Sequence, residues 1–205
     1  MQIEFEGKKI IFERIPSKLD EMAMYFSKKL RNCGIEHVFV SGYVSILFGR
    51  NRASEDIDII IERISMEKFL TFWNSLDRME CIITSEPEEA YEYLKESIAV
   101  RFSWIGKIIP NIEMKFSSNY VHRKALNEKI TVVLNGVPIP ISPLELQIAY
   151  KLFLGSEKDI EDARFLFDLF RDNMDLQKLI VLMKSLKVDE KKSKEYLGWS
   201  DVRGN

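Results

Sequence analysis

The segment that most constrains the fold is residues 56–61, which reads Asp-Ile-Asp-Ile-Ile-Ile. Isoleucine is β-branched and favours extended strands. Because isoleucines occupy both faces of this segment, we expect a strand that lies inside a sheet covered by helices. Together with the other patterns of the chain, this predicts an α+β fold with a mixed β-sheet flanked by helices.

The composition limits the class of protein. A chain of 205 residues with 46% hydrophobic residues can form one full domain and a smaller appended one. A formal charge of −2 gives no global basic field for nucleic acid, and two cysteines are too few for a disulfide framework or a zinc site. Without a bilayer-spanning apolar segment or a signal-peptide pattern, we expect a cytoplasmic protein with no membrane partner.

Apolar spacing and turn residues predict the order of the first elements. The strongest hairpin signal is Asn135-Gly136 between two short apolar runs. The first helix begins with a capping serine, Ser17, and Gly34 is typical of the residue that follows a helix. We expect helices at 17–30, 43–48, 65–79, 87–96 and 120–129, and strands at 36–40, 56–62, 81–84, 98–104, 109–116, 131–134 and 137–141.

From Ser142 onward the pattern becomes helical. The sequence Ser142-Pro143-Leu144-Glu145 combines a capping serine, proline at the first helical position and glutamate at the third. Helices expected at 143–154, 157–171 and 175–186 predict a C-terminal helical bundle. We therefore divide the chain into residues 1–141 and residues 142–205, with a charged tail after Lys187 in which Tyr196, Leu197 and Trp199 are able to dock.

Two aspartates in the first part are candidate metal ligands. Asp56 and Asp58 are two positions apart on one strand, so their carboxylates point to the same face. Like charges repel at this distance unless a hard cation such as Mg²⁺ lies between them. Gly42 lies where a strand turns into a helix, so backbone N–H groups there can approach phosphate oxygens. This combination is typical of phosphoryl-transfer sites.

Glu113 is the best candidate for a third acid. It lies between Ile112 and Met114 on an apolar strand, and burial of an acid is unfavourable unless it is paired or holds a metal. In two-metal chemistry the cations activate the attacking oxygen and stabilise the leaving pyrophosphate. An exposed, harmless position of Glu113 on an edge strand is the alternative.

These residues carry a family resemblance. Ser41-Gly42, followed after thirteen residues by Asp56-Ile57-Asp58, resembles the signature of the polymerase-β-like nucleotidyltransferase superfamily. Gly49, Arg52 and Ser54 strengthen the match. The resemblance implies a nucleotidyltransferase-like fold, with Asp56, Asp58 and Glu113 as catalytic metal ligands and Ser41, Gly42, Arg52 and Ser54 on the nucleotide side of the site.

A second motif narrows the resemblance. Lys151 with Lys158-Asp159-Ile160-Glu161-Asp162 is similar to the helical motif of AbiE-type abortive-infection toxins and related bacterial and archaeal nucleotidyltransferases. This implies that Lys151 and Asp159 face the nucleotide. The plainer alternatives are a lysine whose amine extends to solvent and a helix start capped by Ser156.

The chain departs from the usual pattern in ways that leave two hypotheses open. Ser41 stands where glycine is common, bulky Tyr43 follows Gly42, and the third acid is Glu rather than Asp. The first hypothesis is an enzyme that uses Mg²⁺ or Mn²⁺ to transfer a nucleoside monophosphate from a nucleoside triphosphate to a hydroxyl of RNA, protein or a small molecule. A toxin role would add an antitoxin partner. The second is a catalytically inactive binding module with the same fold.

The basic residues of the chain each allow two interpretations. Arg50 and Arg52 either contact phosphate or solvate a turn, with Arg52 the better phosphate candidate. The basic stretch Lys115, Arg123, Lys124 and Lys129 either guides an RNA or nucleotide tail or is a solvated face. A DNA-binding regulator is disfavoured, because the chain lacks net positive charge and a recognition helix.

Overall fold

The computed structural model describes residues 2–199, which form two compact units. The α/β unit consists of the chain up to Leu47 together with Arg52–Ser142. The helical unit consists of Phe48–Asn51 and the chain from Pro143 onward. The short segment 48–51 therefore belongs to the helical unit although it lies between two parts of the α/β unit in sequence.

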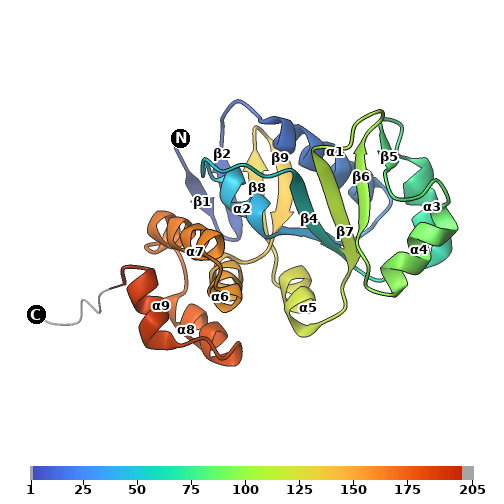
Figure 1. The fold of residues 1–205 in the computed structure, drawn as a ribbon. Coiled ribbons are helices and arrows are strands. Elements are labelled where there is room, and N and C mark those ends of the chain that lie inside the picture. Colours follow the sequence, from blue (N-terminus) through green and yellow to red (C-terminus); the bar gives the residue numbers. More distant parts are fainter. Residues whose placement is uncertain (1, 200–205) are drawn as a thin grey trace, which may run out of the picture. The chain divides into compact units, whose positions relative to one another are not determined.

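Helices are interspersed among the strands of the α/β unit (Figure 1). Its helices are α1 (Lys18–Asn32), α2 (Gly42–Leu47), α3 (Met66–Asn74), α4 (Pro87–Lys95) and α5 (Tyr120–Asn127). Its strands are β1 (Glu4–Glu6), β2 (Lys9–Phe12), β3 (His37–Val40), β4 (Asp56–Ile61), β5 (Met79–Cys81), β6 (Val100–Trp104), β7 (Asn111–Phe116), β8 (Ile130–Leu134) and β9 (Val137–Ile141). The helical unit contains α6 (Leu144–Leu154), α7 (Glu157–Phe170), α8 (Leu176–Ser185) and α9 (Glu190–Tyr196).

Within residues 2–199 the strands form one nine-stranded sheet in the order β1-β2-β8-β9-β3-β4-β7-β6-β5. The pairs β2–β8, β3–β9 and β4–β7 are parallel and the others are antiparallel. This confirms the expected α+β fold with a mixed sheet flanked by helices. No helix of the described part is both long enough and apolar enough to cross a membrane.

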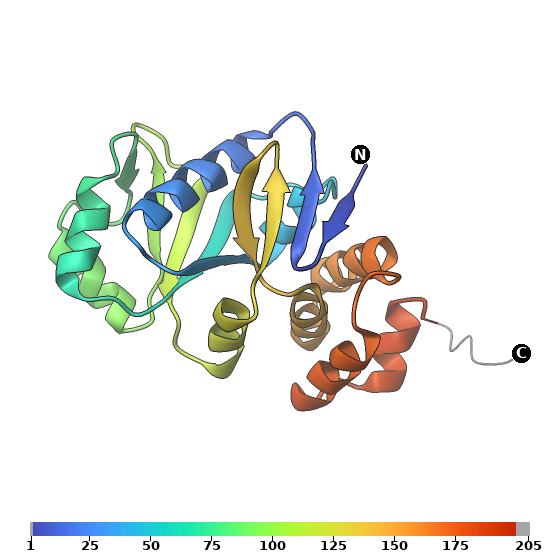
Figure 2. The ribbon, with the colours of Figure 1, turned by 180° about the vertical axis from the view of Figure 1, so that it is seen from behind.

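The core of the α/β unit lies between the sheet and α1. This helix is behind the sheet in Figure 1 and in front of it in Figure 2. Its Phe26 packs against Phe72 of α3 and Phe102 of β6, with ring centroids 5.2 and 5.4 Å apart. Phe102 pairs with Ile112, and Ile112 with Ile57, so the odd-numbered residues of β4 face this core. The two aspartates of β4 therefore point to the other face.

Local sequence signals account for several boundaries. Ser17 and Asp20 form a reciprocal capping box at the start of α1. Asn135 and Gly136 adopt φ angles of 50° and 77°, as a tight hairpin between β8 and β9 requires. Both elements were predicted where they occur.

Other predictions were wrong in detail. Ser142 does not cap α6: Pro143 is the N-cap residue without a side-chain hydrogen bond, because the N–H of Ser142 extends the sheet by donating to the carbonyl of Phe39. The helix expected at 65–79 ends at Asn74, and the strand expected at 81–84 is β5, at Met79–Cys81. The cause is local, since Ser75 caps α3 by donating its hydroxyl to the carbonyl of Phe72.

Three elements carried too little sequence pattern to be predicted. All three residues of β1 are exposed, and β2 has only four residues, so each strand is too short to give a clear sequence signal. The third is α9, which follows Lys187 in the charged tail. The docking expected for that tail is confirmed, because Leu197 is buried and the ring of Trp199 packs on Phe167 with centroids 5.2 Å apart.

Candidate active site

The predicted acids lie in one region of the sheet because of strand register. Asp58 of β4 pairs directly with Glu113 of the parallel strand β7, and Asp56 pairs with Asn111. Residues that pair across neighbouring strands point to the same face. On its other edge β4 pairs with β3, and Val40, the last residue of β3, is opposite Asp58. Ser41 directly follows Val40. The α/β unit thus brings together Asp56, Asp58, Glu113 and the Ser41-Gly42 turn.

Asp56 has a hydrogen-bonding neighbour that sequence reasoning missed. The amide of Asn111 donates to Oδ1 of Asp56 over 2.7 Å, while Asn111 Oδ1 is buried and has no hydrogen-bond partner among the described residues. Ser54, one of the predicted nucleotide-side residues, instead donates its hydroxyl to the backbone carbonyl of Asp56. An amide at this register position gives no sequence signal by itself.

Glu113 is engaged by cations of the protein. Arg101 of β6 forms an ion pair with Oε1 of Glu113, and Nζ of Lys115 lies 3.6 Å from Oε2. Across residues 2–199, no group of three or more His, Cys, Asp or Glu side chains is arranged to hold a metal ion. The three predicted acids are therefore neighbours in the sheet but do not form a ready-made cage.

The residues present nevertheless fit a hard divalent cation. Carboxylate and amide oxygens are the donors that Mg²⁺ prefers. Asp56 and Asp58 supply carboxylates on one face, and the unpartnered amide oxygen of Asn111 belongs to the residue that pairs with Asp56. Asp56 and Asp58 would hold the ion, with Glu113 as a further donor once it leaves its ion pairs.

The environment of Asp58 makes its ionised form less favourable than in water. Burial is the largest cause that raises the pKa of Asp58, and the carboxylates of Glu113 and Asp56 raise it further. Lys115 and a hydrogen bond with Ser41 act in the opposite direction. Two like charges beside a partly buried carboxylate are the arrangement that a bound cation would neutralise.

The Ser41 hydrogen bond leads to a prediction about titration. In Ser41→Gly the pKa of Asp58 should rise above its wild-type value, because the carboxylate loses a donor to its charged form. A raised folded pKa means that the stabilisation from protonated Asp58 is complete below its ordinary value of 3.8 and is lost as pH rises through the folded pKa. In Ser41→Gly this stabilisation should therefore be lost at a higher pH than in the wild type. Carboxyl ¹³C NMR titration of the metal-free protein measures the shift.

The matched control for this titration is Ser54→Ala. Its hydroxyl bonds a backbone carbonyl rather than the Asp58 carboxylate, so this variant should leave the Asp58 titration unchanged. An unchanged or lower Asp58 pKa in Ser41→Gly would contradict the prediction. Ser41 also has a φ of 62°, the left-handed region that favours glycine, so glycine fits this turn without backbone strain.

The guanidinium of Arg52 packs directly against the backbone of Gly42. A Cβ at this position would lie 2.8 Å from Nη2 and 3.0 Å from Cζ of Arg52. Tyr43, the bulky residue that follows, does not fill this space: it is fully buried in the core, where its hydroxyl donates to Asp20 over 3.0 Å. The expected obstacle at the turn is therefore absent, and the Arg52 guanidinium lies against Gly42.

This close packing predicts a separation of binding from stability. In Gly42→Ala the new Cβ displaces the Arg52 guanidinium, and we expect nucleoside triphosphate affinity to fall about tenfold through loss of a charged contact. The free energy of unfolding should stay within about 1 kcal/mol of the wild type, because the displaced group is the end of a flexible side chain. Calorimetric nucleotide titration and thermal unfolding measure the two effects. Ser45→Ala in the same helix is the control, and unchanged affinity in Gly42→Ala would refute a role for Arg52.

The helical unit contains a buried charge network around Asp162. Lys151 is 2% exposed and donates to Oδ2 of Asp162 over 2.6 Å, while Arg50 forms an ion pair with Oδ1 of Asp162 and with Glu161. The alternative of a solvent-extended Lys151 is therefore wrong. Sequence reasoning preferred Asp159 to Asp162, because the burial of Asp162 depends on how the helices pack and is not visible in the sequence.

Asp159 has both a capping partner and a basic one. Its backbone N–H and carboxylate exchange hydrogen bonds with the hydroxyl of Ser156, which confirms the predicted cap of α7. Its Oδ1 lies 3.3 Å from Nζ of Lys151. The two residues that the resemblance assigned to the nucleotide are thus neighbours in the helical unit.

The remaining candidates have structural partners. Lys124 pairs with Glu128 and Lys129 with Glu36, which favours a solvated face over a basic patch. Burial lowers the pKa of His37 to about 4, so its ring is neutral at pH 7. Its Nδ1 lies 2.9 Å from the carbonyl of Ile35 and its Nε2 lies 2.7 Å from the hydroxyl of Ser27. His37 therefore has a structural role.

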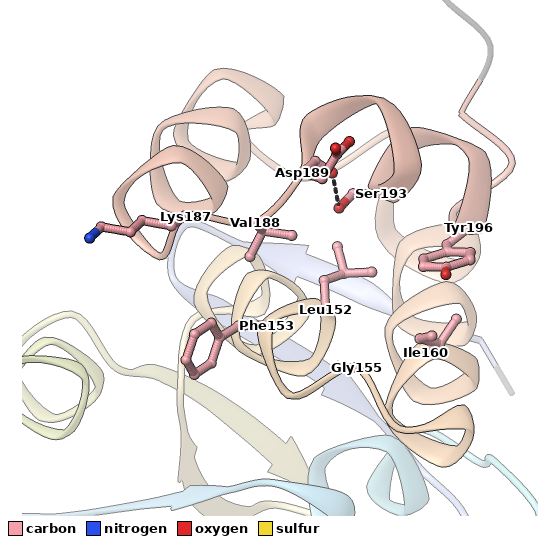
Figure 3. A pocket seen from close by; sticks show the side chains of 9 residues that line it. All are labelled: Leu152, Phe153, Gly155, Ile160, Lys187, Val188, Asp189, Ser193 and Tyr196. Carbon is pink, nitrogen blue, oxygen red and sulfur yellow. Dashed lines mark hydrogen bonds between the residues drawn. The ribbon is translucent and has the colours of Figure 1, made fainter.

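A separate hollow lies wholly within the helical unit (Figure 3). It has a volume of about 320 Å³ and is lined by Leu152, Phe153, Gly155, Ile160, Lys187, Val188, Asp189, Ser193 and Tyr196. The hydroxyl of Ser193 donates to the backbone carbonyl of Asp189 at its rim. None of the predicted site residues lines this pocket.

Comparison with solved structures identifies the class of fold. The crystal structure of an antigenic nucleotidyltransferase-like protein from Paracoccidioides brasiliensis aligns with a TM-score of 0.54 at 15% identity, covering 88% of this chain and 92% of that one. The fold is therefore nucleotidyltransferase-like. ANT(2″)-Ia in complex with adenylyl-2″-tobramycin aligns with a TM-score of 0.53 at 12% identity, covering 83% of this chain and 98% of that one. No protein-family model and no curated protein sequence matches the chain.

Proposed function

We propose that this protein is a nucleotidyltransferase that transfers a nucleoside monophosphate from a nucleoside triphosphate to a hydroxyl group and releases pyrophosphate. The observation that carries the proposal is the shared face of Asp56, Asp58 and Glu113 beside the Ser41-Gly42 turn. The nucleotidyltransferase-like fold agrees with this arrangement.

Each group of residues has a distinct role in this proposal. Asp56 and Asp58 would hold Mg²⁺ or Mn²⁺, which would neutralise charge on the triphosphate and activate the attacking hydroxyl. Ser41 orients the Asp58 carboxylate through its hydrogen bond. The backbone at Gly42 and the Arg52 guanidinium packed against it contact the phosphate oxygens.

Labelled nucleoside triphosphates test the transfer directly. The full chain is incubated with each of the four triphosphates, Mg²⁺ and one acceptor class at a time: cellular RNA, cellular protein or aminoglycosides. The last class is included because a protein of similar fold was solved with adenylyl-2″-tobramycin. We expect label on one acceptor class with release of pyrophosphate. Absence of transfer together with absence of metal-dependent nucleotide binding would refute the proposal.

A catalytically inactive binding protein is the second candidate. It is favoured by the ion pairs of Glu113 with Arg101 and Lys115, which occupy the third acid. Calorimetry separates the candidates, because a site that has lost its ligand-binding geometry gives no heat with nucleotide and Mg²⁺. Heat without transfer to any acceptor would favour a nucleotide-dependent binding role.

A toxin role is the finer proposal. It is supported by the similarity of the Lys151–Asp162 motif to AbiE-type toxins, and it implies an antitoxin protein as partner. Induced expression in a bacterial host should then arrest growth, and expression of the Asp58→Asn variant should leave growth normal. Growth arrest that persists in the inactive variant would separate toxicity from nucleotide transfer.

A further inference from the structure

The third acid is surrounded by the protein's own cations. Arg101 of β6 is paired in register with Glu113 of β7, which in turn is paired with Asp58 of β4. The three side chains therefore form one row across three strands. Within this row the Arg101 guanidinium engages Oε1 of Glu113, and Lys115 lies 3.6 Å from Oε2.

We propose that Arg101 is a positioning residue that competes with a divalent cation for Glu113. Arg101 holds the carboxylate of Glu113, and it gives the carboxylate up when a cation binds at Asp56 and Asp58. This inference rests on the proposed function, because it requires that these two aspartates bind a cation.

Exposure makes this pair exchangeable. The Arg101 side chain is 48% exposed, so water screens its attraction to Glu113. The Lys151–Asp162 pair, by contrast, is 2% and 0% exposed, and its separation would leave a buried charge. An exposed arginine opposite a half-buried acid can turn to solvent when another cation takes its place.

Direct titration with Mn²⁺ tests the proposal without any activity measurement. Electron paramagnetic resonance of the free ion gives the dissociation constant for the full chain. We expect Arg101→Gln to bind Mn²⁺ about three- to fivefold more tightly than wild type, the range that an exposed ion pair allows. Lys107→Gln, which removes an exposed charge from the turn between β6 and β7, is the matched control and should change the affinity less.

A double-mutant cycle separates competition from a general charge effect. If Arg101 acts by occupying Glu113, Arg101→Gln should have no effect on Mn²⁺ affinity in a Glu113→Gln background. Equal tightening in both backgrounds, or unchanged or weaker binding in the single variant, would overturn the inference while leaving the metal site intact. If neither wild type nor Arg101→Gln binds Mn²⁺, the metal site of the proposed function fails as well.

Discussion

Asp58→Asn is expected to lower the rate of nucleotidyl transfer by about a thousandfold, corresponding to about 4 kcal/mol of lost transition-state stabilisation. Asparagine keeps the size of the side chain and still accepts the Ser41 hydrogen bond, but it lacks the negative charge that holds a divalent cation. Since burial and two neighbouring carboxylates already disfavour the ionised form of Asp58, the variant should fold at least as stably as wild type. Single-turnover kinetics with labelled triphosphate measure the loss.

The matched control is Glu55→Gln, one residue before the strand. Glu55 is exposed and precedes the Asp56–Asp58 face, so neutralising it should change the rate less than about threefold. If Asp58→Asn retained more than about a tenth of the activity, the chemistry would not depend on the β4 aspartates. The site would then have to be sought elsewhere in the chain.

The second large effect concerns stability rather than catalysis. Asp162→Ala is expected to lower the free energy of unfolding by about 3–5 kcal/mol, the usual result of breaking a buried ion pair from one side. The substitution removes the carboxylate nearest to the Nζ of Lys151, a side chain that is 2% exposed, and it also removes a partner of Arg50. Chemical denaturation of the full chain, followed by circular dichroism, measures the change.

Asp168→Ala in the same helix is the control for this substitution. Its carboxylate is 54% exposed and lies 3.8 Å from Arg164, so its loss should change stability by less than about 0.5 kcal/mol. A similar small effect of Asp162→Ala would mean that Lys151 finds another partner or reaches water. The double variant Asp162→Ala with Lys151→Met tests this, because removing both charges should restore part of the lost stability.

The two networks differ in what they can contribute to function. Asp56, Asp58 and Glu113 form a half-buried face of negative charge in the α/β unit, partly balanced by exposed Arg101 and half-buried Lys115. Asp162 holds Lys151 and Arg50 together inside the helical unit. The first arrangement suits exchange of one cation for another, while the second suits a fixed structure.

Local chemistry explains what could be predicted from the sequence. The alternation of Asp56 and Asp58 on one strand follows from the two-residue period of extended chains. The capping box of Ser17 and the hairpin at Asn135-Gly136 depend only on residues within one turn. Each of these features is contained in a short segment, so its physical cause is present in the sequence itself.

The neighbours of the site were decided by tertiary structure. Arg101 meets Glu113 because β6 and β7 pair in one register, and a shift of one residue would send both side chains to the other face. Tyr43 leaves the turn open because the core accepts its ring and Asp20 accepts its hydroxyl hydrogen bond. Asp162 is buried only because α7 packs against Lys151 of α6. The sequence alone therefore determined most of the elements and the aspartate pair, whereas strand register and helix packing, which join distant segments, decided which charges surround them.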